Sequence, residues 1–248
     1  MVTALGLPES IRVCLFDLDG VITRTALVHA KAWKDTFDSY LQTRSAATGE
    51  PFVEFDAGQD YNKHVDGKPR ATGVRDFLAS RGITLPEGTP DDPVDAQTVN
   101  GVGNLKNEAV QRRIHEDGVE VYDGSVRYVR AAIEAGLTTA VVSSSANTRE
   151  VLTVTGLLDL FPVIVDGVTA RRDGLTGKPA PDTFLSGAQQ CGASPAEAAV
   201  FEDAVAGVQA GRAGDFGYVI GVDRVGQAEA LRAEGADVVV QDLDELMS

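Results

Sequence analysis

The sequence has little positive charge. Its 248 residues include 22 lysines and arginines against 37 aspartates and glutamates, which gives a formal net charge of −15. Nucleic acids and anionic membranes bind basic faces, so we expect neither as a partner. A phosphate ligand would have to be held by local donors or by a metal, against an unfavourable overall field.

Cysteine is also scarce. Cys14 and Cys191 have no paired spacing, which is typical of free thiols in a reducing cytosol. No apolar run approaches the roughly 18 residues of a membrane helix. The opening stretch MVTALGLPES lacks the basic start and apolar core of a secretion signal. We therefore expect a cytoplasmic protein, and we expect it to be a monomer.

What the chain does contain is the composition of an ordinary globular protein, with 43% hydrophobic and 24% charged residues. Helical patterns occupy residues 147–155, 181–192 and 204–214. They alternate with strand-like runs at 11–17, 137–143, 162–167, 198–203, 217–222 and 237–240. Alternation of this kind predicts an α/β fold, with a Rossmann-like parallel sheet covered by helices on both faces.

Residues 25–120 have a different sequence pattern. They contain helix-like runs at 26–41, 73–82 and 99–118 and no clear strand. We therefore expect a helical cap domain over 25–120, inserted into an α/β core made of 1–24 and 121–248.

The stretch VCLFDLDGVIT ends an apolar run with Asp17 and Asp19. Residues two apart on a strand point the same way, and ligands bind beyond the carboxyl ends of parallel strands. Two neighbouring carboxylates resist joint ionisation unless a cation lies between them or one keeps a proton. The motif alone also fits an Asp-Gly turn with solvated acids.

A second acidic pair, Glu202 and Asp203, follows the expected strand at 198–203. Acids at the ends of two parallel strands would make an oxygen-ligand pocket that suits Mg²⁺, an ion usually shared with phosphate. Taken alone, Asp203 could equally cap the following helix.

Two further segments fit the same edge of the sheet. In SSSAN (143–147), Ser143 and nearby backbone N–H groups could receive a phosphate oxygen, although serine at such a junction is also a common helix cap. In GKPAPD (177–182), Lys178 lies between a glycine and a proline, where a free surface lysine is the ordinary interpretation.

The order and spacing of these segments resemble the haloacid dehalogenase (HAD) superfamily: DLDGV, a serine at a strand end, GKPAPD, and ED before a glycine-containing helix. The resemblance implies the HAD fold, with Asp17 as the nucleophile on phosphorus and Asp19 as general acid/base. It also implies that Mg²⁺ is bound by the side chains of Asp17 and Asp203 and the backbone carbonyl of Asp19, with Glu202 in or just outside that set. The transferring phosphoryl oxygens would be held by Ser143, Ser144 and Lys178.

The cap resembles the β-phosphoglucomutase subfamily. The similarity lies in DGVITRTALVHAKAW (19–33), HVDGKPRATGVRDFL (64–78) and GNLKN (103–107). It implies that Arg70 grips the phosphate farther from the nucleophile. The other substrate-side residues that it implies are Thr25, His29, Lys106, Asn107, Ser145 and Asn147.

Three hypotheses follow for function. The first is a mutase that interconverts β-glucose 1-phosphate and glucose 6-phosphate through a 1,6-bisphosphate and an aspartyl-phosphate. The second is a phosphatase acting on sugar phosphates or related small metabolites, and the third is a sensor that only binds them. Arg24 stands where relatives often have an acid and Ala146 where they have a basic residue, and these departures bear on the substrate.

Overall fold

The computed structural model describes residues 2–247 and contains two compact units. One comprises the residues up to Thr25 together with those from Val119 onward, and the other is Ala26–Gly118. Among the described residues, no helix combines the length and the apolar character needed to cross a bilayer.

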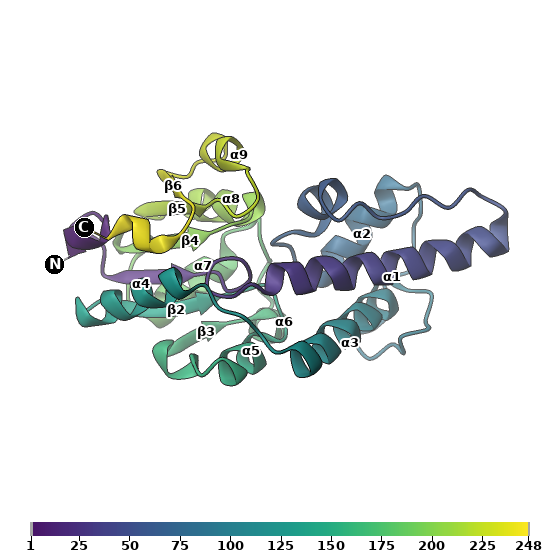
Figure 1. Cartoon of the computed structure of the whole chain (residues 1–248), viewed down its shortest axis with the longest axis horizontal. Coiled ribbons are helices and arrows are strands. Elements are labelled where there is room, and N and C mark those ends of the chain that lie inside the picture. The colour runs from purple at the N-terminus through teal and green to yellow at the C-terminus, as the bar shows by residue number, and fades with distance from the viewer. Residues whose placement is uncertain (1, 248) are drawn as a thin grey trace. The chain divides into compact units, whose positions relative to one another are not determined.

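The first unit is built on a parallel sheet of six strands (Figure 1). In spatial order these are β3 (Val163–Val165), β2 (Thr138–Val142), β1 (Val13–Phe16), β4 (Ala198–Glu202), β5 (Tyr218–Val222) and β6 (Val238–Val240). Val13 of β1 lies opposite Thr138 on one side and Ala198 on the other, so the first strand becomes the middle of the sheet. The expected α/β, Rossmann-like fold is confirmed.

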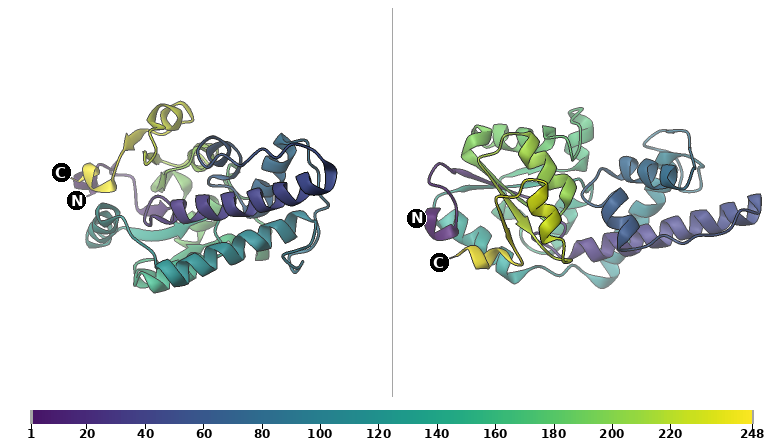
Figure 2. Two further views of the ribbon diagram at one scale, coloured as in Figure 1. Left: turned by 45° about the vertical axis from the view of Figure 1, so that its right-hand side comes forward. Right: turned by 90° about the horizontal axis from the view of Figure 1, so that it is seen from above.

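Helices cover both faces of the sheet (Figures 1 and 2). Leu15 belongs to a core with Phe184, Val208 and Leu231, which come from three helices on one face. On the other face, Phe16 stacks on Phe201 at 4.3 Å and meets Tyr128 edge-on. The helices of this unit are α4 (Asp123–Glu134), α5 (Thr148–Val154), α6 (Gly167–Arg172), α7 (Asp182–Gln190), α8 (Val205–Ala213) and α9 (Ala228–Ala233).

Helix α4 was not expected from the sequence. Its Tyr128, Val129 and Ala132 are buried, and they recur at the helical spacing that marks one apolar face. The tyrosine hydroxyl donates to the carbonyl of Leu5 at 2.8 Å, so the helix is fixed both by packing and by a buried hydrogen bond. This apolar spacing is visible in the sequence, but α4 precedes the alternation of strands and helices from which the other helices of the unit were predicted.

The described residues of the second unit form helices and irregular segments, and no strand. It contains α1 (Thr25–Thr48, which starts in the first unit), the π-helical turn η2 (Tyr61–Val65), α2 (Arg70–Ser80) and α3 (Val99–Asp117). Its core is aromatic. The ring of Phe37 stacks on that of Trp33, with 4.9 Å between the ring centres. The centre of the Phe37 ring also lies 4.2 Å from that of Phe77 and 5.2 Å from that of Phe55. Helix α1 extends seven residues beyond the expected end at 41.

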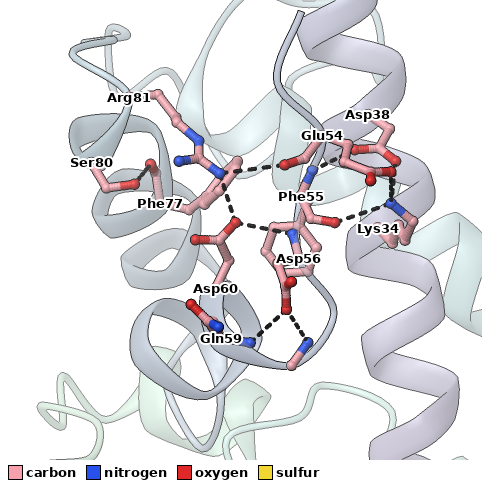
Figure 3. A network of polar contacts seen from close by, with 11 residues as sticks. Lys34, Asp38, Glu54, Phe55, Asp56, Gln59, Asp60, Phe77, Ser80 and Arg81 are labelled. Carbon is pink, nitrogen blue, oxygen red and sulfur yellow. Dashed lines mark hydrogen bonds and ion pairs between the residues drawn. The ribbon is translucent and has the colours of Figure 1, made fainter.

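The irregular segment after α1 is held by a polar network (Figure 3). Lys34 donates to Asp38, Glu54 and the carbonyl of Phe55 at 2.8, 2.9 and 3.0 Å. The amide of Phe55 donates to Asp38 at 2.7 Å, and Arg81 pairs with Asp60 at 2.7 Å. These contacts keep the Phe55 ring in the aromatic core.

Replacing Phe37 by alanine should lower the free energy of unfolding of the helical unit by about 3–5 kcal/mol, since it empties the centre of this core. Phe52→Ala is the matched control, because Phe52 is 40% exposed and Phe37 is fully buried. The control should change the value by less than about 0.5 kcal/mol. Urea unfolding followed by tryptophan fluorescence measures both, and equal losses would contradict the assignment of the core.

Candidate active site

Asp17 lies where β1 ends at the middle of the sheet. Its amide donates to the carbonyl of Phe201 at 2.9 Å, which continues the pairing with β4 by one residue. Its side chain is buried, and the chain then turns at Gly20, whose φ of +94° is a left-handed conformation that favours glycine. The turn is closed by the Gly20 amide, which donates to the carbonyl of Thr23 at 2.8 Å.

Lys178 joins the two acidic motifs. Its ammonium lies 2.5 Å from Asp17 Oδ1 and 2.5 Å from Glu202 Oε1, and it also donates to the carbonyl of Val142 at 3.0 Å. Burial opposes its charge, but Asp17 and Glu202 outweigh that effect and raise the pKa of Lys178 above its ordinary value. The lysine is therefore a fixed positive charge and not the free surface residue that its motif alone would suggest.

The pKa of Asp17 is raised well above its usual range. Burial is the largest cause; Lys178 opposes it, and the neighbouring carboxylates of Glu202 and Asp19 add to it. The Asp17 carboxyl thus has two carboxylates and one ammonium as charged neighbours. Such a cluster favours an additional cation.

Glu202 is fully buried, and its position depends on a glycine. Its Oε2 accepts the amide of Ala204 at 3.0 Å, while Oε1 faces Lys178. A Cβ at Gly207 in α8 would lie only 1.8 Å from Oε1. Gly207 thus leaves the space that the Glu202 carboxylate fills.

Asp19 is held by hydroxyl groups. The hydroxyl of Thr25 donates to one carboxylate oxygen, and that of Ser143 donates to the other at 3.4 Å. The Thr23 and Thr25 hydroxyls are 2.6 Å apart, and Thr23 also donates to the carbonyl of Leu18 at 3.2 Å. The arrangement orients the second acid of the DLDG motif.

Asp203 lies against the turn that follows Asp19. A Cβ at Gly20 would lie 1.8 Å from Asp203 Oδ2, so the carboxylate packs directly on this glycine. The main-chain carbonyl of Asp203 accepts from Gln227 Nε2 at 2.8 Å. The acids at the ends of β1 and β4 are therefore brought to one place.

Hard oxygen donors of this kind fit Mg²⁺. Among residues 2–247, no three His, Cys, Asp or Glu side chains gather closely enough to enclose a metal by themselves. Lys178 already occupies one oxygen of Asp17 and one of Glu202. Mg²⁺ commonly uses one or two carboxylates with waters and substrate phosphate, and Asp17, Asp203 and the main chain at Asp19 could supply that smaller set.

The serine-rich loop after β2 adds donors to the same edge. Ser143 extends the pairing with β3 by donating its amide to Val165 at 3.0 Å, and its hydroxyl accepts the amide of Ser145 at 3.1 Å. The Ser145 hydroxyl in turn accepts the amide of Asn147 at 3.2 Å. Ser144 lies between Ser143 and Ser145 in the chain and is half-buried. Asn147 is buried and precedes the first residue of α5.

Four expected substrate residues lie in the helical unit. His29 Nδ1 and Lys106 Nζ are 2.6 Å apart, and this buried lysine lies over the ring of Trp33 at 4.9 Å. Arg70, at the first position of α2, donates to Asn104 at 3.2 Å. Asn107 follows Lys106 on α3 and is half-buried.

Arg224 was not predicted from the sequence as a residue of this site. It follows β5 and reaches the loop after β1. Its Nε donates to the carbonyl of Gly20 at 2.9 Å. It stands 204 positions from its acceptor, so no local motif could have indicated the contact. The two cysteines carry no chemistry of the site: both are free thiols, and burial raises the pKa of Cys191 to about 11.

The chain is similar to known proteins. A family model described as haloacid dehalogenase-like hydrolase matches residues 11–215. A protein of Mycobacterium bovis named Beta-phosphoglucomutase is 57% identical over 98% of this chain and 94% of its own length. Validoxylamine A 7'-phosphate phosphatase of Streptomyces hygroscopicus subsp. limoneus is 30% identical over 95% of each chain. The crystal structure of beta-phosphoglucomutase from Clostridium difficile superposes with a TM-score of 0.74 at 24% identity, over 95% of this chain and 93% of the other.

Gly207→Ala should lower the free energy of unfolding by about 1–3 kcal/mol, because the added methyl overlaps the Glu202 carboxylate. Helix propensity alone predicts the opposite sign, a gain of about 1 kcal/mol. Gln209→Ala on the same helix is the control, since Gln209 makes an exposed contact with Glu234. Chemical denaturation measures both variants, and a stabilised Gly207→Ala protein would contradict the proposed packing.

Proposed function

Because this chain belongs to the haloacid dehalogenase-like hydrolase family, we propose that it is a phosphoryl-transfer enzyme that uses Asp17 as nucleophile, and that it acts as a β-phosphoglucomutase. The observation that carries the proposal is the placement of Asp17, Lys178 and Glu202 within 2.5 Å contacts at the carboxyl ends of two central strands. The mutase activity is proposed from the name of the mycobacterial relative. In this proposal the sheet unit is the catalytic core and the helical unit is its cap.

The reaction begins with Asp17 carrying a phosphoryl group. The 6-hydroxyl oxygen of β-glucose 1-phosphate attacks the phosphorus, the bond from phosphorus to Asp17 breaks, and Asp19 accepts the hydroxyl proton. The resulting 1,6-bisphosphate turns over in the site. Asp17 then attacks the phosphorus at position 1, Asp19 returns the proton to the leaving sugar oxygen, and glucose 6-phosphate departs from the rephosphorylated enzyme.

The chemistry requires charge neutralisation and in-line placement. Lys178 supplies a fixed positive charge beside Asp17, and Ser143 and Ser144 provide donors for the transferring oxygens. Mg²⁺ bound by Asp17, Asp203 and the Asp19 carbonyl would supply the rest of the neutralisation when it is present, with Glu202 acting through Lys178. Thr25 holds Asp19 in position for proton transfer.

Substrate binding is assigned to two groups of residues. Arg70 would grip the distal phosphate with its planar fork of donors. His29 keeps Lys106 in place, which suits a residue that contacts the sugar. The remaining sugar contacts are proposed for Asn107, Ser145 and Asn147.

The second candidate is a phosphatase that uses water as the acceptor on the same core. It is favoured by the similarity to validoxylamine A 7'-phosphate phosphatase. Ala146, where relatives often have a basic residue, also weakens the case for a bisphosphate. Arg149, three residues further along the chain, is exposed and lies 3.6 Å from Asp166, and in this proposal it could supply a substitute charge.

Product identity decides between the two. With β-glucose 1-phosphate, Mg²⁺ and a trace of 1,6-bisphosphate, we expect glucose 6-phosphate to accumulate without matching release of phosphate. The α-anomer is the substrate control, and free phosphate is followed in the same samples. Stoichiometric release of phosphate would establish the phosphatase instead.

In this assay Asp17→Asn should be inactive and Asp19→Asn should lose about 10²–10⁴-fold in rate. A fully active Asp17→Asn protein would overturn the assignment of Asp17 as nucleophile. A wild-type protein that neither isomerises nor hydrolyses the substrate would leave only the sensor hypothesis.

Arg70→Ala should impair the use of glucose 1,6-bisphosphate far more than the hydrolysis of a simple aryl phosphate, which has no distal phosphate. Arg75→Ala on the same helix is the control, because Arg75 makes an exposed ion pair with Glu87 and should leave both reactions unchanged. Steady-state kinetics on the two substrates measures the effect. Equal losses on both substrates for Arg70→Ala would contradict its assignment to the distal phosphate.

A further inference from the structure

Arg224 contacts the loop that follows β1 and contains Asp19. Its side chain is only 12% exposed, and the guanidinium lies 3.5 Å from the centre of the Tyr122 ring. Besides the bond from Nε to the carbonyl of Gly20, one terminal nitrogen donates to the carbonyl of Val21 at 3.3 Å. Both acceptors lie within two residues of Asp19.

The remaining donors of Arg224 are also used by the protein. One reaches the Ser125 hydroxyl at 3.2 Å and another the carbonyl of Gln241, while Asp242 lies 3.6 Å away. Four of the five guanidinium N–H groups are thus occupied. A cavity of about 400 Å³ adjoins the arginine and is lined also by Arg24, Tyr122 and Asp242. Because so few donors remain, the guanidinium is suited to hold the chain and not an anion in this cavity.

The two carbonyls held by Arg224 belong to the left-handed turn of the loop. Gly20 adopts φ +94°, and it packs against the Asp203 carboxylate. Any change in this turn would move the Asp19 main chain and the oxygens at Asp203 together. A planar fork that fixes the carbonyls of Gly20 and Val21 limits such movement in two successive peptide units.

We propose that Arg224 is a positioning residue for the reaction: by fixing the carbonyls of Gly20 and Val21 it holds Asp19 where proton transfer needs it. The inference rests on the proposed function, because it assigns Asp19 its role there. Arg224 touches no reacting atom in this scheme. Its loss should therefore lower kcat and leave KM nearly unchanged.

Arg224→Lys tests the geometry, since a lysine keeps the charge but cannot reproduce the fork. We expect kcat to fall about 10–100-fold, with KM for β-glucose 1-phosphate within about twofold of wild type, as for loss of an interaction that matters only in the transition state. Arg212→Ala is the matched control. Arg212 belongs to the same unit and also donates to a carbonyl, that of Gly235 at 2.9 Å, and pairs with Asp237 at 2.8 Å. These contacts are away from the loop after β1. The control variant should keep wild-type kinetics.

Chemical rescue supplies a readout that general destabilisation would not give. The cavity beside the side chain offers a route for a guanidinium ion, so low-millimolar guanidinium should restore part of the kcat of Arg224→Ala, and ammonium at the same ionic strength should not. Thermal melts at each concentration show whether stability changes. Arg224→Lys with wild-type kcat, or Arg224→Ala with no rescue by guanidinium, would overturn the proposal.

The closing measurement separates this inference from the function on which it rests. Wild-type protein is incubated with acetyl phosphate and Mg²⁺, and intact mass reports phosphorylation of Asp17. A wild-type protein that takes up no phosphoryl group would overturn the proposed function. A phosphorylated wild type, together with an Arg224→Lys variant that turns over substrate as fast, would leave that function standing and overturn the role of Arg224.

Discussion

The site depends on one buried ammonium between two carboxylates. Lys178 is only 1% exposed, and a lysine so placed is stable only if its partners offset the cost of removing the charge from water. Asp17 and Glu202 do so from the ends of adjacent strands, and the Val142 carbonyl supplies a third acceptor from the strand on the other side. Lys178, Asp17 and Glu202 therefore link β1, β2 and β4 at the edge of the sheet where the proposed chemistry takes place.

This constraint explains residues that touch no substrate in the proposed scheme. Glu202 has to be buried to reach Lys178, and a buried carboxylate needs both donors and space. The Ala204 amide provides the donor, and the missing side chain of Gly207 provides the space. A glycine inside a helix is usually a cost in stability, but here the methyl group it lacks would occupy the position of a required oxygen.

The sequence was informative where contacts follow from strand geometry, and uninformative where they join distant segments. Asp17, Asp19, Glu202 and Asp203 could be placed together because parallel strands end at one edge of a sheet. The pairing of Lys178 with Glu202 and the reach of Arg224 to Gly20 depend on side-chain paths across the sheet, which no spacing encodes. The roles proposed for residues of the helical unit came from family resemblance, since His29 and Lys106 are 77 positions apart and meet only in the folded helices.

The loop after β1 has to resist the charges it brings together. Asp19 raises the pKa of Asp17, so the two carboxylates repel each other whenever both are ionised and no cation compensates. Two independent restraints oppose that repulsion: Thr25 and Ser143 hold the side chain of Asp19, and Arg224 holds the main chain just beyond it. The hydroxyl groups restrain the position of the Asp19 carboxylate, whereas the guanidinium on two carbonyls restrains the turn of the backbone. The proposed proton transfer would require both the position of the carboxylate and its direction, so neither restraint could replace the other.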